Sequence, residues 1–246
     1  MTGPALVVLA HGSRDPRSGV AVQEIVTSTR RLHPDAAVEA AFLDHNAPDL
    51  SRVVERLARA GHREIVVVPL FLSAAYHARF DSPAAVSRAQ ERYPGVTLRL
   101  ADVVGSDPSL LTALDDRLFE VLRSTRNASP DALVLASAGT SDPAANEAVA
   151  ALARLWGQRH RLPASAAFAS TTTPSTGEAV RQWRRAGYRR VAVGSWFIAP
   201  GTLPDRVQDL ANQAGVTAVS RPLGAHGLLC QAILDRYLVS ASAVLV

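Results

Sequence analysis

The sequence is 246 residues long, with 48% hydrophobic and 20% charged residues, which is typical of a soluble globular protein with one large domain or two smaller ones. Its basic residues are all arginine, and the net charge of +4 favours an acidic partner. The single cysteine excludes a disulfide framework, and no apolar run reaches the ~18 residues that a membrane-spanning helix needs.

Nucleic acid is a poor candidate for that acidic partner. The arginines are scattered along helical stretches, and only 6 Phe, 4 Tyr and 3 Trp are present to stack on bases. We therefore expect a small polyanionic molecule and no nucleic acid. The first residues lack a basic region followed by an apolar stretch, so we expect no secretory signal and a cytoplasmic location.

Strand-like apolar runs alternate with amphipathic helical stretches along the whole chain, a pattern typical of α/β proteins. In the first half we expect strands at 5–10, 38–43, 64–71 and 96–101, and helices at 19–32, 48–60, 83–92 and 108–123. Pro48, Pro83 and Pro108 suit the first position of a helix, and Gly61 suits a helix end.

The second half repeats the first after about 126 residues. Residues 6–16 (LVVLAHGSRDP) align with 133–143 (LVLASAGTSDP), and 59–67 (RAGHREIVV) align with 185–193 (RAGYRRVAV). So long a period indicates duplicated domains, which we place at 1–125 and 131–246, on either side of a linker-like stretch. Each domain is expected to hold a mostly parallel four-stranded sheet with helices on both faces.

Two histidines follow buried-looking strands of the first half: His11 after 5–10 and His77 after 64–71. Ligands of open parallel sheets bind outside the carboxyl ends of the strands, so two imidazoles there indicate a metal or proton-transfer site. Asp44 follows the second strand. The second copy keeps the neighbouring glycines and prolines but replaces these three residues with Ala138, Leu203 and Ser170. Such a joint loss favours a role in chemistry over a role in the scaffold.

The neighbours of these residues allow more than one interpretation. Gly12, Ser13 and Arg14 could form an anion-binding turn. Gly12 is matched by a glycine in the second copy, however, so a structural role for Gly12 is at least as well supported as an anion-binding one. His45 adjoins Asp44, and strand alternation predicts that it points away from it. His160 ends an amphipathic helix, where a cationic side chain suits the helix dipole.

With these residues in place, the chain resembles the class II tetrapyrrole chelatases, the family of sirohydrochlorin cobaltochelatases and ferrochelatases, in its long two-domain form. The resemblance covers nearly the whole chain and rests on residues 11–15 (HGSRD), 42–48 (FLDHNAP) and 69–83 (PLFLSAAYHARFDSP). It implies two chelatase-like lobes in which His11 and His77 hold the metal and act in catalysis. It also gives Asp44 a catalytic part, at a position where family members usually have the longer glutamate.

The implied reaction is insertion of a divalent metal ion into sirohydrochlorin for sirohaem or cobalamin synthesis, with Fe²⁺ slightly favoured over Co²⁺ and Ni²⁺ as a third candidate. Neutral imidazoles can hold these ions and accept the pyrrole protons. The substrate of the family is a polycarboxylate, and we expect Ser13, Arg14 and Arg79 to contact it. The chain has no Gly-x-x-x-x-Gly-Lys loop, so we expect no nucleotide or other cofactor beyond the metal substrate.

Two other functions compete with this one. A histidine phosphatase also places a His-Gly pair at a strand end, but that chemistry needs an arginine directly before the histidine, where this chain has Ala10. A non-catalytic carrier of metal or tetrapyrrole on the same fold remains the alternative to an enzyme. Since the duplication supplies two lobes within one chain, we expect a monomer that binds no membrane.

Overall fold

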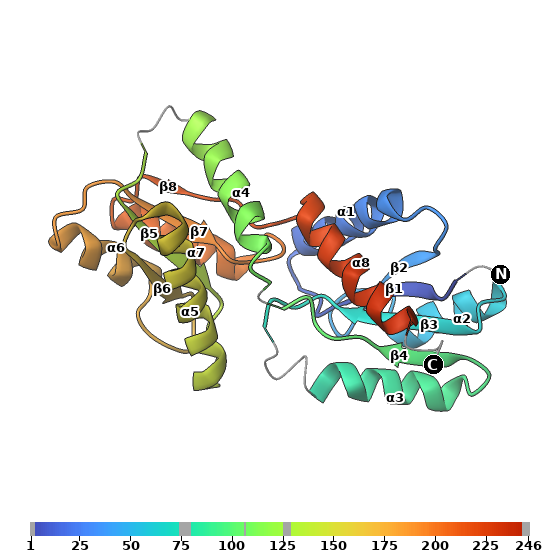
Figure 1. Ribbon diagram of the computed structural model, residues 1–246. Helices are drawn as coiled ribbons and strands as arrows, with labels where there is room; N and C mark the ends of the chain where they lie inside the picture. Colours follow the sequence, from blue (N-terminus) through green and yellow to red (C-terminus); the bar gives the residue numbers. More distant parts are fainter. Residues whose placement is uncertain (1–2, 74–79, 106, 125–128, 243–246) are drawn as a thin grey trace. The chain divides into compact units, whose positions relative to one another are not determined.

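The computed structural model describes residues 3–73, 80–105, 107–124 and 129–242. They divide into two compact units (Figure 1). The first is built from the chain up to Gly105 and from Ala225 onward, and the second from the chain between them, as far as Gly224. None of the helices in the described ranges is long and apolar enough to cross a membrane.

Each unit contains one four-stranded sheet whose strands all run parallel, in the order β2-β1-β3-β4 and β6-β5-β7-β8. The strands of the first unit are β1 (Ala5–Ala10), β2 (Val38–Phe42), β3 (Glu64–Pro69) and β4 (Thr97–Leu100). Those of the second are β5 (Ala132–Ser137), β6 (Ala164–Phe168), β7 (Val191–Ser195) and β8 (Ala218–Val219). The predicted α/β class, with two duplicated parallel sheets, is confirmed.

Helices cover both faces of each sheet because successive strand residues point to opposite sides. In the first unit, α2 (Leu50–Arg59) and α3 (Ser82–Arg92) pack on the face that carries Val7 and Val67. The other face is covered by α1 (Pro16–Leu32) and α8 (Gly227–Ser242), which also pack against each other. Central strands buried on both faces need a continuous apolar run, as in Ala5–Ala10, where every residue is buried.

The second unit repeats this arrangement. The helices α6 (Thr176–Arg185) and α7 (Thr202–Gln213) pack on the face that carries Val134 and Val193. The helices α4 (Leu110–Ser124) and α5 (Pro143–His160) lie on the other face. Gly194 of β7 permits this close packing, since a Cβ there would lie 2.8 Å from atoms of both Leu114 and Trp156.

The units do not divide at the predicted boundary near 125–131. The helix that follows β4 in the chain, α4, packs on β7 and β8 of the second unit, and the last helix, α8, packs on β3 of the first. Each half of the chain thus gives its final helix to the other unit. An amphipathic pattern specifies a buried helix face but not which sheet that face will cover, so the sequence could not reveal the exchange.

Candidate functional site

His11 and Asp44 lie next to each other at the carboxyl edge of the first sheet. His11 directly follows β1, and Asp44 follows the neighbouring strand β2. Their two loops are joined by backbone hydrogen bonds, since the N–H of Leu43 donates to the carbonyl of Ala10 at 2.9 Å and that of Asp44 donates to the carbonyl of His11 at 2.9 Å. The strand pairing therefore continues into the loops and fixes His11 beside Asp44.

Gly12 makes this close approach possible. Its φ is +93°, and a Cβ at this position would lie 1.8 Å from the carbonyl oxygen of Asp44. The second unit uses the same device, since Gly139 has a φ of +83° and a Cβ there would lie 2.2 Å from the carbonyl oxygen of Ser170. Both copies need glycine for the same steric reason, so Gly12 belongs to the scaffold that presents the site.

His45 lies closer to the site than strand alternation predicted. Its backbone has left the extended conformation, with a φ of +60°, so the prediction that it points away from Asp44 is wrong. The N–H of His45 donates to Asp44 Oδ1 at 2.7 Å, and its Nε2 lies 3.5 Å from Asp44 Oδ2. The His45 and His11 rings meet edge to face, with centroids 6.4 Å apart. The alternation rule failed because Asp44 and His45 belong to a turn, where it does not apply.

Ser13 and Arg14 continue the loop after His11 and differ in what they contact. The N–H of Ser13 donates to Asn46 Oδ1 at 2.7 Å, and its hydroxyl oxygen accepts from the N–H of Asp15 at 3.1 Å. Thr140 accepts the matching bond in the second copy, which gives the Ser13 hydroxyl a structural role. Arg14 is exposed and makes no hydrogen bond or ion pair within the described ranges.

Asp15 ends this loop and begins the helix behind it. Its carboxylate accepts hydrogen bonds from the Arg17 side chain and backbone N–H, and these hold the pKa of Asp15 below its ordinary value. Asp142 caps α5 in the same way in the second copy. The cap therefore fixes where α1 starts, and with it the direction in which the His11 loop leaves the sheet.

The other two predicted site residues, His77 and Arg79, lie outside the described residues. Within the described ranges, no group of three or more His, Cys, Asp or Glu side chains is close enough to hold a metal ion. The described part of the site thus comprises the His11 imidazole and the Asp44–His45 pair beside it, with the guanidinium of Arg14 nearby in sequence.

Comparison with known proteins gives the family. A sequence model of the family described as CbiX matches residues 5–121 and, a second time, residues 132–239. The chain belongs to the CbiX family. The double match also confirms the duplication, because each half of the chain satisfies the same family pattern.

Relatives in this family carry the names expected from the resemblance. The chain is 29% identical over 213 residues to a sirohydrochlorin cobaltochelatase of Priestia megaterium, covering 85% of this chain and 69% of that one. It is 24% identical over 215 residues to a sirohydrochlorin ferrochelatase of the same species, covering 87% and 80%.

Solved structures show the same fold. The structure of SirB from Bacillus subtilis with Fe³⁺ matches with a TM-score of 0.81 at 22% identity, covering 98% of this chain and 96% of that one. The SirB chelatase of Bacillus subtilis subspecies spizizenii, in complex with cobalt, matches with a TM-score of 0.78 at 22% identity, covering 98% and 97%.

Proposed function

We propose that this protein is a chelatase that inserts a divalent metal ion into sirohydrochlorin. The family match over both repeats carries the proposal, together with the sirohydrochlorin chelatases among the relatives. The first unit adds the chemistry, because it brings His11 and Asp44 together at the carboxyl edge of its sheet, where ligands of such sheets bind. The second unit has Ala138 and Ser170 at the same points and keeps only the scaffold.

The residues divide into two roles under this proposal. His11 and His77 hold the metal substrate and accept protons from the pyrrole nitrogens, tasks for which neutral imidazoles are suited. A mostly exposed carboxylate, Asp44, sits beside His11 and attracts the incoming cation, with His45 holding its orientation. The carboxylates of the substrate bind at Arg14, with Arg79 and Ser13 as further contacts, since arginine grips carboxylates through two parallel N–H groups.

Fe²⁺ is our proposal for the metal in the cell, ahead of Co²⁺ and Ni²⁺. The ferrochelatases of Priestia megaterium and Bacillus subtilis among the relatives support iron, and the cobaltochelatase of Priestia megaterium supports cobalt. Imidazole ligands bind all three ions, so metal supply also decides which one is inserted. Deletion of the gene separates the pathways: iron as the metal predicts loss of sirohaem, and cobalt predicts loss of cobalamin.

Three further expectations belong to this proposal. No nucleotide or other cofactor is required, because metal insertion is favourable once the pyrrole protons have left. The protein acts as a monomer, since the duplication supplies two lobes in one chain. It works in the cytoplasm. Light scattering of the purified protein tests the oligomeric state, and metallation in buffer without nucleotide tests the cofactor requirement.

Visible absorption of sirohydrochlorin on addition of Fe²⁺ or Co²⁺ tests the activity itself. We expect acceleration over the reaction without protein, and a loss of at least about a hundredfold in His11→Ala with an almost unchanged unfolding midpoint. The rate should fall below about pH 6, because a protonated imidazole neither binds metal nor accepts a proton. His62→Ala, in the turn before β3 and so at the amino edge of the same sheet, is the control. Binding of the tetrapyrrole without acceleration by either metal would favour the carrier instead.

A further inference from the structure

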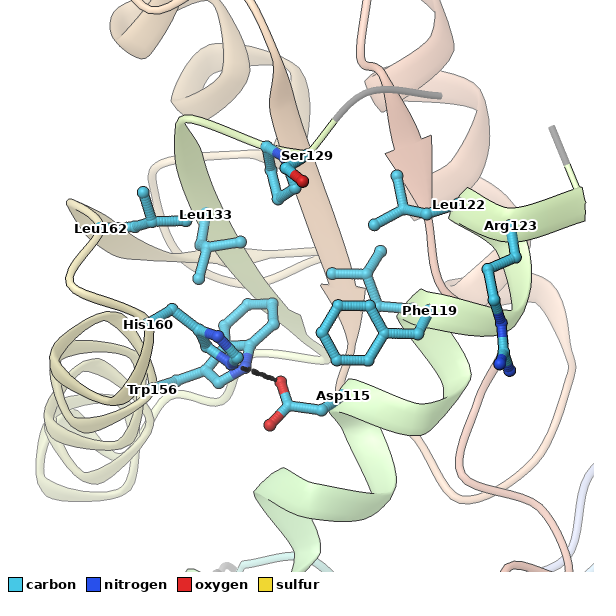
Figure 2. Close-up of a pocket in the computed structure, with 11 residues that line it drawn as sticks. Asp115, Phe119, Leu122, Arg123, Ser129, Leu133, Trp156, His160 and Leu162 are labelled. Atoms are coloured by element: carbon cyan, nitrogen blue, oxygen red, sulfur yellow. Dashed lines mark hydrogen bonds and ion pairs between the residues drawn. The ribbon is translucent and has the colours of Figure 1, made fainter. Parts of the chain in front are cut away.

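The second unit contains a cavity of about 570 Å³ that the chelatase site does not use. It lies between α4 and α5, beside the start of β5, and is therefore at the amino edge of the sheet, opposite the loops of Ala138 and Ser170. Apolar side chains form most of its wall, and Figure 2 labels Phe119, Leu122, Leu133, Trp156 and Leu162 among them. Leu118 of α4 also lines the cavity. A cavity of this size with such a wall is typical of small-molecule sites.

The first unit shows how the same fold closes this space. Arg117 of α4 donates to the carbonyl of Leu223, and Arg236 of α8 donates to those of Val103 and Val104, so the two helices occupy matching places. This match pairs Leu118 with Tyr237. In the first unit, Tyr237 is buried and its hydroxyl donates to the carbonyl of Pro4 at 2.7 Å.

The leucine in the second unit is too short to fill that volume. The helices α1 and α8 also pack against each other in the first unit, whereas α4 and α5 approach each other less closely. Phe119, on the cavity wall, keeps 45% of its surface exposed. At this place in the fold the cavity is therefore specific to the second copy and does not follow from the shared fold.

A hydrogen-bonded carboxylate forms one end of the cavity. Asp115 is 8% exposed, and its Oδ1 lies 2.7 Å from both Trp156 Nε1 and His160 Nε2 (Figure 2). Its other oxygen lies 3.9 Å from Arg159, which donates to the hydroxyl of Thr112. The matching residue of the first unit is Leu234, in the core, so this polar group also belongs to the second copy alone. Because these groups already surround the Asp115 carboxylate, it needs no cation from a ligand.

Arg123 is a second charged residue on the cavity wall, besides Asp115. It lines the cavity at the end of α4, is exposed, and has no carboxylate within ion-pair distance in the described part of the chain. We propose that this cavity binds a small amphipathic anion, with a flat apolar ring system against the wall and one acidic group at Arg123. The apolar rings cover Phe119 and the leucines, and the acidic group pairs with the guanidinium of Arg123.

Two dyes with the same rings separate the two parts of this proposal: anilinonaphthalene sulfonate, which is an anion, and phenylnaphthylamine, which has no acidic group. We expect the sulfonate to bind once per chain with increased fluorescence. Leu118→Tyr, which installs the residue of the first copy, should weaken binding of both dyes at least about tenfold. Leu155→Tyr, on an exposed part of α5 outside the cavity, is the matched control and should change neither.

Arg123→Gln tests the acidic group and, at an exposed position, should leave the fold intact even if Leu118→Tyr does not fold. It should weaken binding of the sulfonate at least about fivefold and leave binding of phenylnaphthylamine unchanged. Arg206→Gln, at an exposed position of α7, is the control and should change the binding of neither dye. Unchanged sulfonate binding in folded Leu118→Tyr, or no binding to the unmodified protein, would overturn the site. Equal affinity for both dyes that is insensitive to Arg123→Gln would overturn the anionic ligand.

Discussion

Gly12 and Gly139 are the residues through which each sheet brings its first two loops together. We expect Gly12→Ala to destabilise the protein by more than about 1 kcal/mol, since alanine at a φ of +93° is strained and its Cβ would collide with the carbonyl of Asp44. Gly139→Ala should also be costly, because its φ is +83° and its Cβ would lie 2.2 Å from the carbonyl oxygen of Ser170. Urea unfolding of both variants provides the measurement.

The metallation rates of the same two variants separate scaffold from site. Gly12→Ala should also lose metallation, because the displaced loop carries His11. Gly139→Ala should retain it at temperatures where the protein stays folded, because its loop carries Ala138 and lies beside Ser170, where the first unit has His11 and Asp44. Equal stability of Gly12→Ala and the unmodified protein would show that the loop can rearrange around a Cβ.

We propose that Arg14 binds substrate and does not support the fold, since it is exposed and has no hydrogen bond or ion pair in the described ranges. We expect Arg14→Ala to raise the KM for sirohydrochlorin several-fold with little change in kcat, the sign of lost binding in both ground and transition states. The effect should shrink as salt is added, because exposed charges are screened over about 8 Å at physiological ionic strength. Arg88→Ala, also exposed in the first unit, serves as the control. A change in kcat alone would place Arg14 in the chemical step.

The matching helices of the two units begin with side-chain caps at corresponding positions. Asp49 begins α2, and Ser175 begins the matching helix α6 with a capping box, in which Ser175 and Glu178 bond to each other's backbone N–H. Ser175→Ala should cost about 1 kcal/mol of stability, measured by urea unfolding at neutral pH. Thr202→Ala, at the first residue of α7, whose cap makes no side-chain hydrogen bond, should cost much less.

This capping box also has a defined pH dependence. Hydrogen bonds from the backbone N–H and hydroxyl of Ser175 lower the pKa of Glu178 below its ordinary value. Stabilisation by a group with a lowered pKa is present above the unfolded-state pKa and is lost as the pH falls through the folded-state value. The stability difference between Ser175→Ala and the unmodified protein should therefore narrow as the pH falls below the ordinary range of glutamate. A stability difference that stays constant as the pH falls below that range would assign the cap to the Ser175 hydroxyl alone.

The elements themselves were largely predictable, because continuous apolar runs identify buried parallel strands without knowledge of their partners. Errors arose where local signals compete. Pro48 was expected to begin a helix, but it lies before the Asp49 cap, and α2 starts at Leu50. The prediction for His45 failed for a related reason, since it applied strand alternation to a turn. The position of His11 beside Asp44 was predictable, because parallel neighbours end at one edge of a sheet.

The exchange of helices was not predictable, and it decides what can fold alone. The predicted lobe 1–125 ends with α4, which packs on the second sheet, and it lacks α8. The helix α8 buries Leu229, Cys230 and Ile233 on the first unit, and Arg236 binds the carbonyls of Val103 and Val104. An arginine that secures each exchanged helix to the end of its sheet is a feature of tertiary structure, which no local pattern encodes.

We therefore expect a fragment of residues 1–125 to be unfolded, since the face of its sheet that α8 covers would be open to water. A fragment of residues 1–105 joined by a flexible linker to residues 225–246 should fold, because it contains every element of the first unit. Circular dichroism and the cooperativity of urea unfolding distinguish the two, and Ile233→Asp in the joined fragment is the control that should unfold it, because a buried unpaired charge cannot be accommodated. A cooperatively folded 1–125 fragment would show that α4 can replace α8, and that the exchange is a choice between two equivalent packings.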